Sequence, residues 1–306
     1  MEIYLGTWQV APSDGFWTDQ DPKESEKVIA QAIKMGVCAF DTAQSYGKGR
    51  AEQVLAKVLR RFPQKQFKVD TKIMPSSKDP ADLLKISQNR LGKIKIDCLY
   101  LHWPRTGFDN PDFLKKMLNL KRSNLINKVG VCNLPLADLT NLIKQGILID
   151  RLQIPISLLW TRDLQQTMAF CRENKIELAA YSPTGMGLLS GKYRFPTDLN
   201  DARQNLFCFD QRCIKAFHNL LDIINTIAAT HSVTLQETPT AVALAWVCSK
   251  HPDILILGAR TKSQLIQNLG NHLQLSAPEL SALDLAASEL AQASAPVCEN
   301  IFSYDW

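Results

Sequence analysis

The stretch Phe40-Asp41-Thr42-Ala43-Gln44-Ser45-Tyr46-Gly47-Lys48-Gly49 lies between a short apolar run, residues 36–39, and an amphipathic segment, residues 50–61. Apolar residues at helical spacing in the second segment predict a helix, and the run before the stretch predicts a buried strand. The stretch itself is then a strand-to-helix loop with an aspartate at the strand end and a tyrosine five residues later. Because loops on a rigid scaffold concentrate function, we expect this loop to supply a proton donor.

The same unit of strand, loop and helix recurs along most of the 306 residues. Strands are predicted at 5–9, 37–41, 67–72, 96–101, near 127–131, 152–154, 176–181 and 254–257. Helices are predicted near 23–35 and 50–61, through 83–91 and 113–118, and near 135–145, 163–174, 213–230, 239–249, 262–270 and 278–292. A long irregular stretch, 183–210, interrupts the alternation, and an extended tail follows the last helix.

Eight strands that alternate with helices indicate an α/β fold with parallel strands, because each crossover is long enough to hold a helix. A (β/α)8 TIM barrel needs ~250 residues, which leaves room for the long loop after the seventh strand and for the C-terminal helix and tail. A doubly wound sheet is the alternative, but its phosphate-binding fingerprint would need a third glycine after Gly47-Lys48-Gly49. We therefore predict a single barrel domain over residues 1–306.

The composition excludes several classes of protein. Hydrophobic residues make up 45% and charged residues 21%, and the net charge of +5 comes from scattered Lys and Arg. A nucleic-acid-binding protein usually has a basic face, no run approaches the ~18 apolar residues of a membrane helix, and the first residues do not resemble a signal peptide. The eight cysteines form no CxxC pair, so we expect reduced thiols and no metal site. These features predict a cytoplasmic protein without nucleic-acid or membrane partners.

Four polar residues fall at the C-terminal ends of three successive predicted strands, on the face where barrel active sites lie. Asp41 ends the second strand, Tyr46 lies on its loop, Lys72 ends the third strand and His102 follows the fourth. A cation beside a phenol lowers the phenol pKa from ~10, which would make Tyr46 a general acid near neutral pH. His102 would orient a substrate carbonyl by a hydrogen bond.

Each of these residues also has a purely structural interpretation. A tyrosine on such a loop is usually a packing residue with a hydrated hydroxyl, and a lysine–aspartate pair is usually a structural ion pair. A histidine at a strand end often does no more than form a hydrogen bond. The placement of all four on neighbouring strands favours the chemical interpretation.

These motifs together resemble the aldo-keto reductase superfamily, and they are Gly36…Asp41-Thr42-Ala43…Tyr46-Gly47…Gly49…Glu52, Thr71-Lys72 and Leu101-His102-Trp103-Pro104. The resemblance extends from about Leu5 to Asn268, and its elements occur in the order found in the family. It implies a (β/α)8 barrel that binds NADP(H) without a Rossmann fold. It also implies the reduction of aldehydes and ketones by hydride and proton transfer.

The resemblance implies a catalytic role for each of the four residues. Tyr46 is implied as the proton donor and Lys72 as the cation that tunes it. Asp41 is implied as the partner of Lys72, and His102 as the residue that orients the carbonyl.

The resemblance also implies a set of cofactor contacts. Asn133 and Gln153 match positions that hydrogen-bond the carboxamide, and Cys132 replaces a serine, so the contact there is weaker. Segment 181–193 resembles the pyrophosphate loop. Arg260 would meet a 2′-phosphate and favour NADP over NAD, with a solvated surface arginine as the alternative. The implied cofactor-binding residues are Thr7, Trp8, Asp41, Cys132, Asn133, Gln153, Tyr181, Ser182, Pro183, Gly185, Leu188, Gly191, Lys192, Gly258, Ala259, Arg260, Gln264, Gln267 and Asn268.

Aromatic residues near the predicted strand ends suggest an apolar pocket for a small-molecule carbonyl substrate, and core packing is the alternative for each of them. The candidates are Trp8, Phe16, Trp17, Trp103 and Trp160. With Tyr46 and His102 at the reacting end, the predicted substrate pocket consists of Trp8, Trp17, Tyr46, His102 and Trp103.

Two alternative functions come from other classes. A nicotinamide-binding sensor or regulatory protein would keep the site but turn over little, and an added interaction domain would mark it; the sequence shows none. A phosphate-binding barrel isomerase would need a catalytic carboxylate in place of the tyrosine. We predict an NADPH-dependent aldehyde or ketone reductase that is a monomer.

Overall fold

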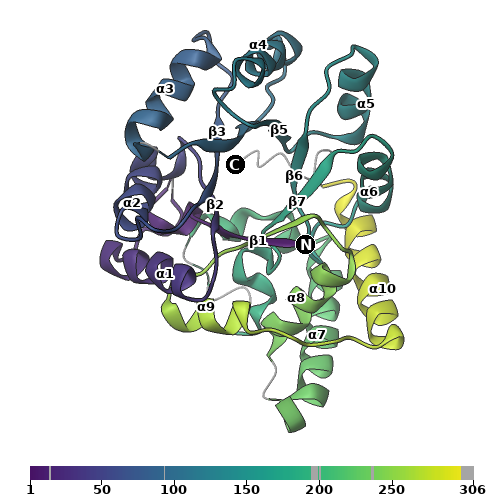
Figure 1. The fold of residues 1–306 in the computed structure, drawn as a ribbon. Coiled ribbons are helices and arrows are strands. Elements are labelled where there is room, and N and C mark those ends of the chain that lie inside the picture. Colours follow the sequence, from purple (N-terminus) through teal and green to yellow (C-terminus); the bar gives the residue numbers. More distant parts are fainter. Residues whose placement is uncertain (14, 93, 194–198, 200, 236–237, 298–306) are drawn as a thin grey trace.

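The computed structural model describes residues 1–13, 15–92, 94–193, 199, 201–235 and 238–297. Its centre is a closed barrel in which each strand pairs with the next in parallel and the last strand pairs with the first (Figure 1). The strands are β1 (Glu2–Gly6), β2 (Ala39–Asp41), β3 (Lys68–Ile73), β4 (Ile96–Leu101), β5 (Lys128–Cys132), β6 (Arg151–Pro155), β7 (Glu177–Tyr181) and β8 (Ile254–Leu257). The predicted (β/α)8 barrel is confirmed.

Helices follow each strand and surround the barrel (Figure 1). They are α1 (Pro22–Lys34), α2 (Arg50–Leu59), α3 (Pro80–Leu91), α4 (Asn110–Arg122), α5 (Leu136–Lys144), α6 (Leu164–Glu173), α7 (Ile214–Leu235), α8 (Pro239–Ser249), α9 (Lys262–Leu269) and α10 (Ala277–Ser294). Several begin where local chemistry favours a helix start. The Asp21 and Asp79 carboxylates each accept a backbone N–H, and a proline follows each of them. Such a proline supplies a helical φ at a position whose N–H needs no partner.

The first strand differs from its prediction, which placed it at residues 5–9. The strand is Glu2–Gly6 because its backbone pairs with β8 from Glu2 opposite Ile254 to Leu5 opposite Leu257. The chain then leaves the barrel, and residues Trp8–Val10 form a 3-10 turn, η1. This turn moves Trp8 from the predicted strand into the loop at the mouth of the barrel.

The irregular stretch after β7 contains three short 3-10 helices, η3 (Gly185–Ser190), η4 (Ala202–Asn205) and η5 (Phe207–Phe209). Inside η3, Met186 and Gly187 have φ angles of 54° and 88°, so the backbone turns sharply over the barrel mouth. Part of this loop, and the predicted C-terminal tail from residue 298 onward, lie outside the described residues. That residues 1–306 form one domain stays a prediction.

Within the described residues, no helix is both long and apolar enough to cross a membrane. The seven cysteines described are free thiols, and most are buried.

A layer of buried polar side chains lies inside the barrel around Arg151, the first residue of β6. Arg151 on β6 is 2% exposed, and its guanidinium donates to Asp70 Oδ2 at 2.5 Å and to Glu177 Oε2 at 2.8 Å. The Asp70 carboxylate also accepts the backbone N–H of Cys98. Asp70 lies opposite Asp41 in the pairing of β3 with β2. Side chains opposite each other in paired strands point to the same face, so the Asp70 and Asp41 side chains both point into the barrel.

Breaking this pair would leave a buried, uncompensated charge. We expect Arg151→Met to lower the free energy of unfolding by about 3–5 kcal/mol, because Asp70 would lose its counter-ion. Urea denaturation followed by circular dichroism measures the loss. The exposed Arg172→Met serves as the control and should change little. A loss below about 1 kcal/mol in the Arg151 variant would show that the pair does not support the barrel.

Candidate active site

The structure brings the four predicted catalytic residues together at the C-terminal ends of neighbouring strands. Asp41 ends β2, Lys72 lies in β3 and His102 directly follows β4. Tyr46 begins the 3-10 turn η2 (Tyr46–Gly49), which joins β2 to α2. The closed pairing of β2 with β3 and of β3 with β4 is what places these side chains around one point.

The Lys72 ammonium is the centre of the cluster. It donates to Asp41 Oδ1 at 2.5 Å, to the Thr42 carbonyl at 2.8 Å and to the Tyr46 hydroxyl at 3.2 Å. The side chains of Lys72 and Asp41 are 0% and 4% exposed. Burial is the largest single influence and disfavours the charged ammonium, but the nearby groups, with the Asp41 carboxylate first among them, together raise the Lys72 pKa above its usual value. Lys72 therefore remains a cation whose three protons are all directed at oxygen atoms.

The second oxygen of Asp41 is also bonded. Gln153 on β6 donates its side-chain amide to Asp41 Oδ2 at 2.8 Å. Thr7 donates both its backbone N–H and its hydroxyl to the Asp41 carbonyl oxygen, at 2.9 and 3.0 Å. Asp41 is thus held from both sides, and its carboxylate fixes the position of Lys72. Gln153 was predicted as a carboxamide contact, and its observed bond is to this carboxylate.

The expected lowering of the Tyr46 pKa toward neutrality is wrong for this structure. Burial is the largest influence and raises the Tyr46 pKa to about 12, although Lys72 lowers it by charge and by its hydrogen bond. Asp41 adds to the rise because a second negative charge nearby disfavours the phenolate. Burial of the phenol is the main physical reason, and the Asp41 carboxylate that holds Lys72 opposes the effect of that cation. Tyr46 therefore keeps its proton throughout the physiological range.

His102 faces the same point from the next strand. Its ring centroid lies 5.6 Å from that of Tyr46, in an edge-on arrangement, and its Nδ1 lies 3.3 Å from Ser45 Oγ. Burial, and secondarily the Lys72 charge, hold the His102 pKa well below its ordinary value. The imidazole is therefore neutral near pH 7, and it can offer one N–H to a hydrogen-bond acceptor.

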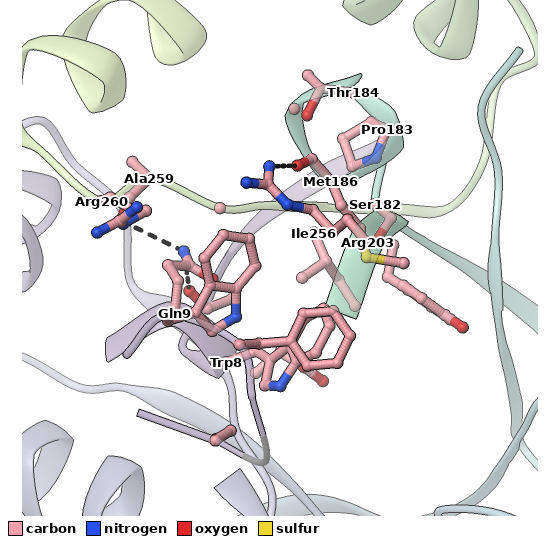
Figure 2. Close-up of a pocket in the computed structure, with 18 of the residues that line it drawn as sticks. Trp8, Gln9, Ser182, Pro183, Thr184, Met186, Arg203, Ile256, Ala259 and Arg260 are labelled. Carbon is pink, nitrogen blue, oxygen red and sulfur yellow. Dashed lines mark hydrogen bonds between the residues drawn. The ribbon is translucent and has the colours of Figure 1, made fainter. Parts of the chain in front are cut away.

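A cavity of about 950 Å³ opens above the cluster. Tyr46, His102 and Trp103 line its reacting end, and Lys192, Arg203 and Arg260 line it farther out. Figure 2 shows Gln9, Ala259 and Arg260 on one side of this space and the Ser182–Met186 loop with Arg203 across from them. The cavity therefore joins an aromatic end beside Tyr46 to an end that carries three cations.

The structure separates the predicted cofactor residues into two groups. The members that line the cavity, besides Asp41, are Trp8, Asn133, Gln153, Tyr181, Ser182, Pro183, Lys192, Gly258, Ala259, Arg260, Gln264, Gln267 and Asn268. The members outside its lining are Thr7, Cys132, Gly185, Leu188 and Gly191. The roles of all of them stay predictions.

Four residues of the cavity wall have a left-handed backbone conformation. Trp17, Asn133, Ser182 and Met186 all line the cavity and have φ angles between 50° and 57°. Left-handed φ is uncommon for residues with a Cβ, and such strain gathers at functional sites. The Asn133 side chain accepts a hydrogen bond from the Tyr181 hydroxyl at 2.8 Å, so its amide is oriented in the wall.

Most of the aromatic candidates for a substrate pocket lie at the cavity, and their role in binding substrate stays a prediction. Trp8, Phe16, Trp17 and Trp103 line the cavity, and the Trp8 ring centroid lies 6.3 Å from that of Tyr46. Trp160 is 2% exposed and packs in the core outside the cavity lining, which is the alternative left open for each candidate.

Two buried residues of the cavity wall escaped prediction. Arg203 is 6% exposed and donates to the Met186 carbonyl and the Tyr193 hydroxyl, each at 2.9 Å, while also pairing with Asp201 (Figure 2). Gln9 donates to the carbonyl oxygens of Gly6 and Ala259 and so ties two loops together. Both lie in irregular loops without periodicity, so their burial left no sequence signal.

Among the described residues, no group of three or more His, Cys, Asp or Glu side chains is arranged to hold a metal ion.

Known proteins resemble the chain over nearly its whole length. The sequence profile of the Aldo/keto reductase family matches residues 2–287. An uncharacterized oxidoreductase of Mycobacterium tuberculosis is 29% identical over 99% of this chain and 93% of its own. An NADH-specific methylglyoxal reductase of Escherichia coli is 26% identical over 87% of each chain. The structure of a glycerol dehydrogenase of Gluconobacter oxydans shares the fold, with a TM-score of 0.77 at 22% identity over 95% of this chain and 91% of that one.

The low pKa of His102 leads to a test by pH titration. We expect the His102 imidazole to be neutral near pH 7 and to take up a proton only well below the range of an ordinary histidine, because burial and Lys72 both lower its pKa. Nitrogen-15 chemical shifts of the five histidines measure this, with His102 assigned by its absence in His102→Gln. A His102 signal that titrates between pH 6 and 7 would contradict the assigned environment.

Proposed function

We propose, since the chain belongs to the aldo/keto reductase family, that it reduces aldehyde or ketone carbonyls to alcohols with NADPH and that Tyr46 donates the proton. The observation that carries this proposal is the 3.2 Å hydrogen bond between Lys72 and the Tyr46 hydroxyl, at the end of a cavity that His102 also lines. A phenol and a neutral imidazole then face the same space, and the phenol is hydrogen-bonded to a fixed cation.

The proton transfer follows from the charges around Tyr46. The pKa of Tyr46 near 12 keeps its proton in place while a carbonyl compound enters. As negative charge develops on the carbonyl oxygen, that oxygen becomes basic enough to accept the proton. Lys72 then stabilises the new phenolate, which lies within hydrogen-bond distance of its ammonium. Because this help grows as the phenolate forms, it stabilises the transition state more than the ground state.

His102 would orient the substrate rather than exchange a proton. Its neutral ring can donate one N–H to the carbonyl oxygen, which places that oxygen near the Tyr46 hydroxyl. Asp41 acts through Lys72 and is a positioning residue, because both its carboxylate oxygens are already bonded within the protein.

The cavity residues fit an extended nicotinamide dinucleotide. Lys192, Arg203 and Arg260 provide positive charge along the outer part of the cavity, which suits phosphate groups. Gly187 lines the same part and has a φ of 88°, and a Cβ there would face the Arg203 guanidinium at 3.7 Å. Its lack of a side chain leaves the backbone open to close approach. When bound, NADPH would supply the hydride that adds to the carbonyl carbon.

The residues of the cavity wall also indicate the class of substrate and of cofactor. Trp8, Phe16 and Trp103 make the wall near Tyr46 aromatic, which suits an uncharged small-molecule carbonyl compound. Arg260 supports NADP over NAD because a planar guanidinium matches a phosphate. Cytoplasmic location and a monomeric state stay predictions.

Removing the phenolic hydroxyl tests the assigned proton donor. We expect Tyr46→Phe to lower kcat for carbonyl reduction by a factor of about 10²–10⁴, the usual contribution of a general acid. NADPH oxidation with a panel of aldehydes and ketones measures this. The Kd for NADPH should change little, since the substitution leaves the outer cavity untouched.

Tyr4→Phe is the matched control. The Tyr4 hydroxyl is buried without a hydrogen-bond partner among the described residues and does not line the cavity, so its loss should leave turnover unchanged. Undiminished activity in Tyr46→Phe would remove Tyr46 from its role. Tight NADPH binding by the wild-type protein with no turnover of any substrate would instead favour a nicotinamide-binding sensor.

A further inference from the structure

We propose that Asp19 sets how strongly this site prefers a 2′-phosphorylated cofactor, by occupying the edge of Arg260 that the phosphate would use. The inference rests on the proposed function, because it assumes that Arg260 faces the adenosine end of a bound dinucleotide. Asp19 would then be a specificity-determining residue that weakens the preference for NADPH over NADH.

Arg260 is held in place without help from Asp19. Its Nε donates to Gln20 Oε1 at 2.9 Å, and Gln20 returns a hydrogen bond from its amide to the Arg260 carbonyl at 3.1 Å. Gln20 is itself 8% exposed and anchored to Ser25. The Gln264 side chain accepts the Arg260 backbone N–H at 2.9 Å, and the Trp17 ring lies 5.7 Å from the guanidinium carbon. These contacts fix the guanidinium and leave its outer nitrogen atoms for an anion.

Asp19 is the anion found there. Its Oδ1 lies 2.8 Å from Arg260 Nη2, and its side chain is 75% exposed, whereas that of Arg260 is 30% exposed. Arg260 lines the cavity and Asp19 does not. The hydrogen bond from Arg260 holds the pKa of Asp19 below its usual range, so the carboxylate stays charged at physiological pH. An ion pair with one partner so exposed is weak, and a phosphate entering the cavity can displace it.

The neighbouring Arg203 does not remove the competition between Asp19 and a 2′-phosphate for Arg260. Arg203 approaches the same Trp17 ring, at 5.4 Å, and its guanidinium already pairs with Asp201. The Trp17 indole N–H is buried and has no hydrogen-bond partner among the residues that the structure describes. A 2′-phosphate would therefore gain Arg260 only after displacing Asp19, and it would remain close to that carboxylate. A nucleotide with a free 2′-hydroxyl would leave the ion pair intact.

Two nucleotides that differ only in the 2′-phosphate isolate this effect without turnover. We expect Asp19→Asn to tighten the Kd for adenosine 2′,5′-bisphosphate by about three- to tenfold, the range of a weak ion pair plus relieved repulsion. The Kd for adenosine 5′-monophosphate should stay within about twofold, because that ligand does not need the outer edge of Arg260. Isothermal titration calorimetry on the full-length protein measures both constants.

Asp138→Asn is the matched control, since it removes one exposed negative charge on α5, away from α9 (Figure 1). It should alter neither Kd. In an Arg260→Gln background, the Asp19→Asn effect on the bisphosphate should become clearly smaller, because the part that comes from the contact between the two residues is lost. Circular dichroism confirms that each variant is folded.

Three results would overturn the inference. They are a weaker or unchanged bisphosphate Kd in Asp19→Asn, an equal tightening for both nucleotides, and an effect that is undiminished in the Arg260→Gln background. If these occur while the wild-type protein binds both nucleotides and reduces carbonyl compounds, only the role of Asp19 fails. A wild-type protein that binds neither nucleotide would overturn the proposed function and this inference together.

Discussion

The buried pair of Lys72 and Asp41 is the constraint on which the rest of the site depends. Charges inside a protein are costly unless they are paired and fully hydrogen-bonded. Here the pair is completed by Gln153, by the Thr42 carbonyl and by the Tyr46 hydroxyl. Only a closed barrel brings these groups, which come from three strands and a loop, around one ammonium. The same requirement explains the polar layer of Arg151 and Asp70 beside it, since each buried charge there also has a partner.

The electrostatics of the pair define the character of the proposed acid. Lys72 alone would lower the Tyr46 pKa, but burial and the Asp41 carboxylate raise it to about 12. Before a substrate binds, the site therefore contains a neutral phenol beside a neutral imidazole, and the Lys72 cation is hydrogen-bonded to the phenol. In such a site Tyr46 keeps its proton until a substrate oxygen becomes basic enough to accept it. Lys72 stabilises the negative charge of the phenolate as that charge forms. The structure thus places the Tyr46 hydroxyl and the Lys72 ammonium correctly, and it does not bring the Tyr46 pKa close to neutrality.

Outside this centre, the loops make the cavity. The aromatic residues beside Tyr46 come largely from the loop after β1, and the cations come from the loops after β7 and β8. Buried polar side chains tie these loops together: Gln9 and Gln20 bond the loop after β1 to that after β8, and Arg203 secures η3. Asp19 differs from them because it is exposed and its partner faces the cavity. That difference makes it a residue for selectivity rather than for stability.

The sequence by itself determined the barrel and which four polar residues meet at its C-terminal end. Strands and helices have periods that can be read locally, and Asp41, Tyr46, Lys72 and His102 occupy strand ends whose common face follows from the topology. It could not place β1, because pairing with β8 rather than local composition decides where that strand ends. It missed the bond of Gln153 to Asp41, 112 residues away, and the buried position of Arg203. The contact between Asp19 and Arg260 and the net pKa of Tyr46 also came only from the tertiary structure. Such contacts join loops that have no periodicity, and a pKa depends on burial and on all charges nearby, which exist only once the chain has folded.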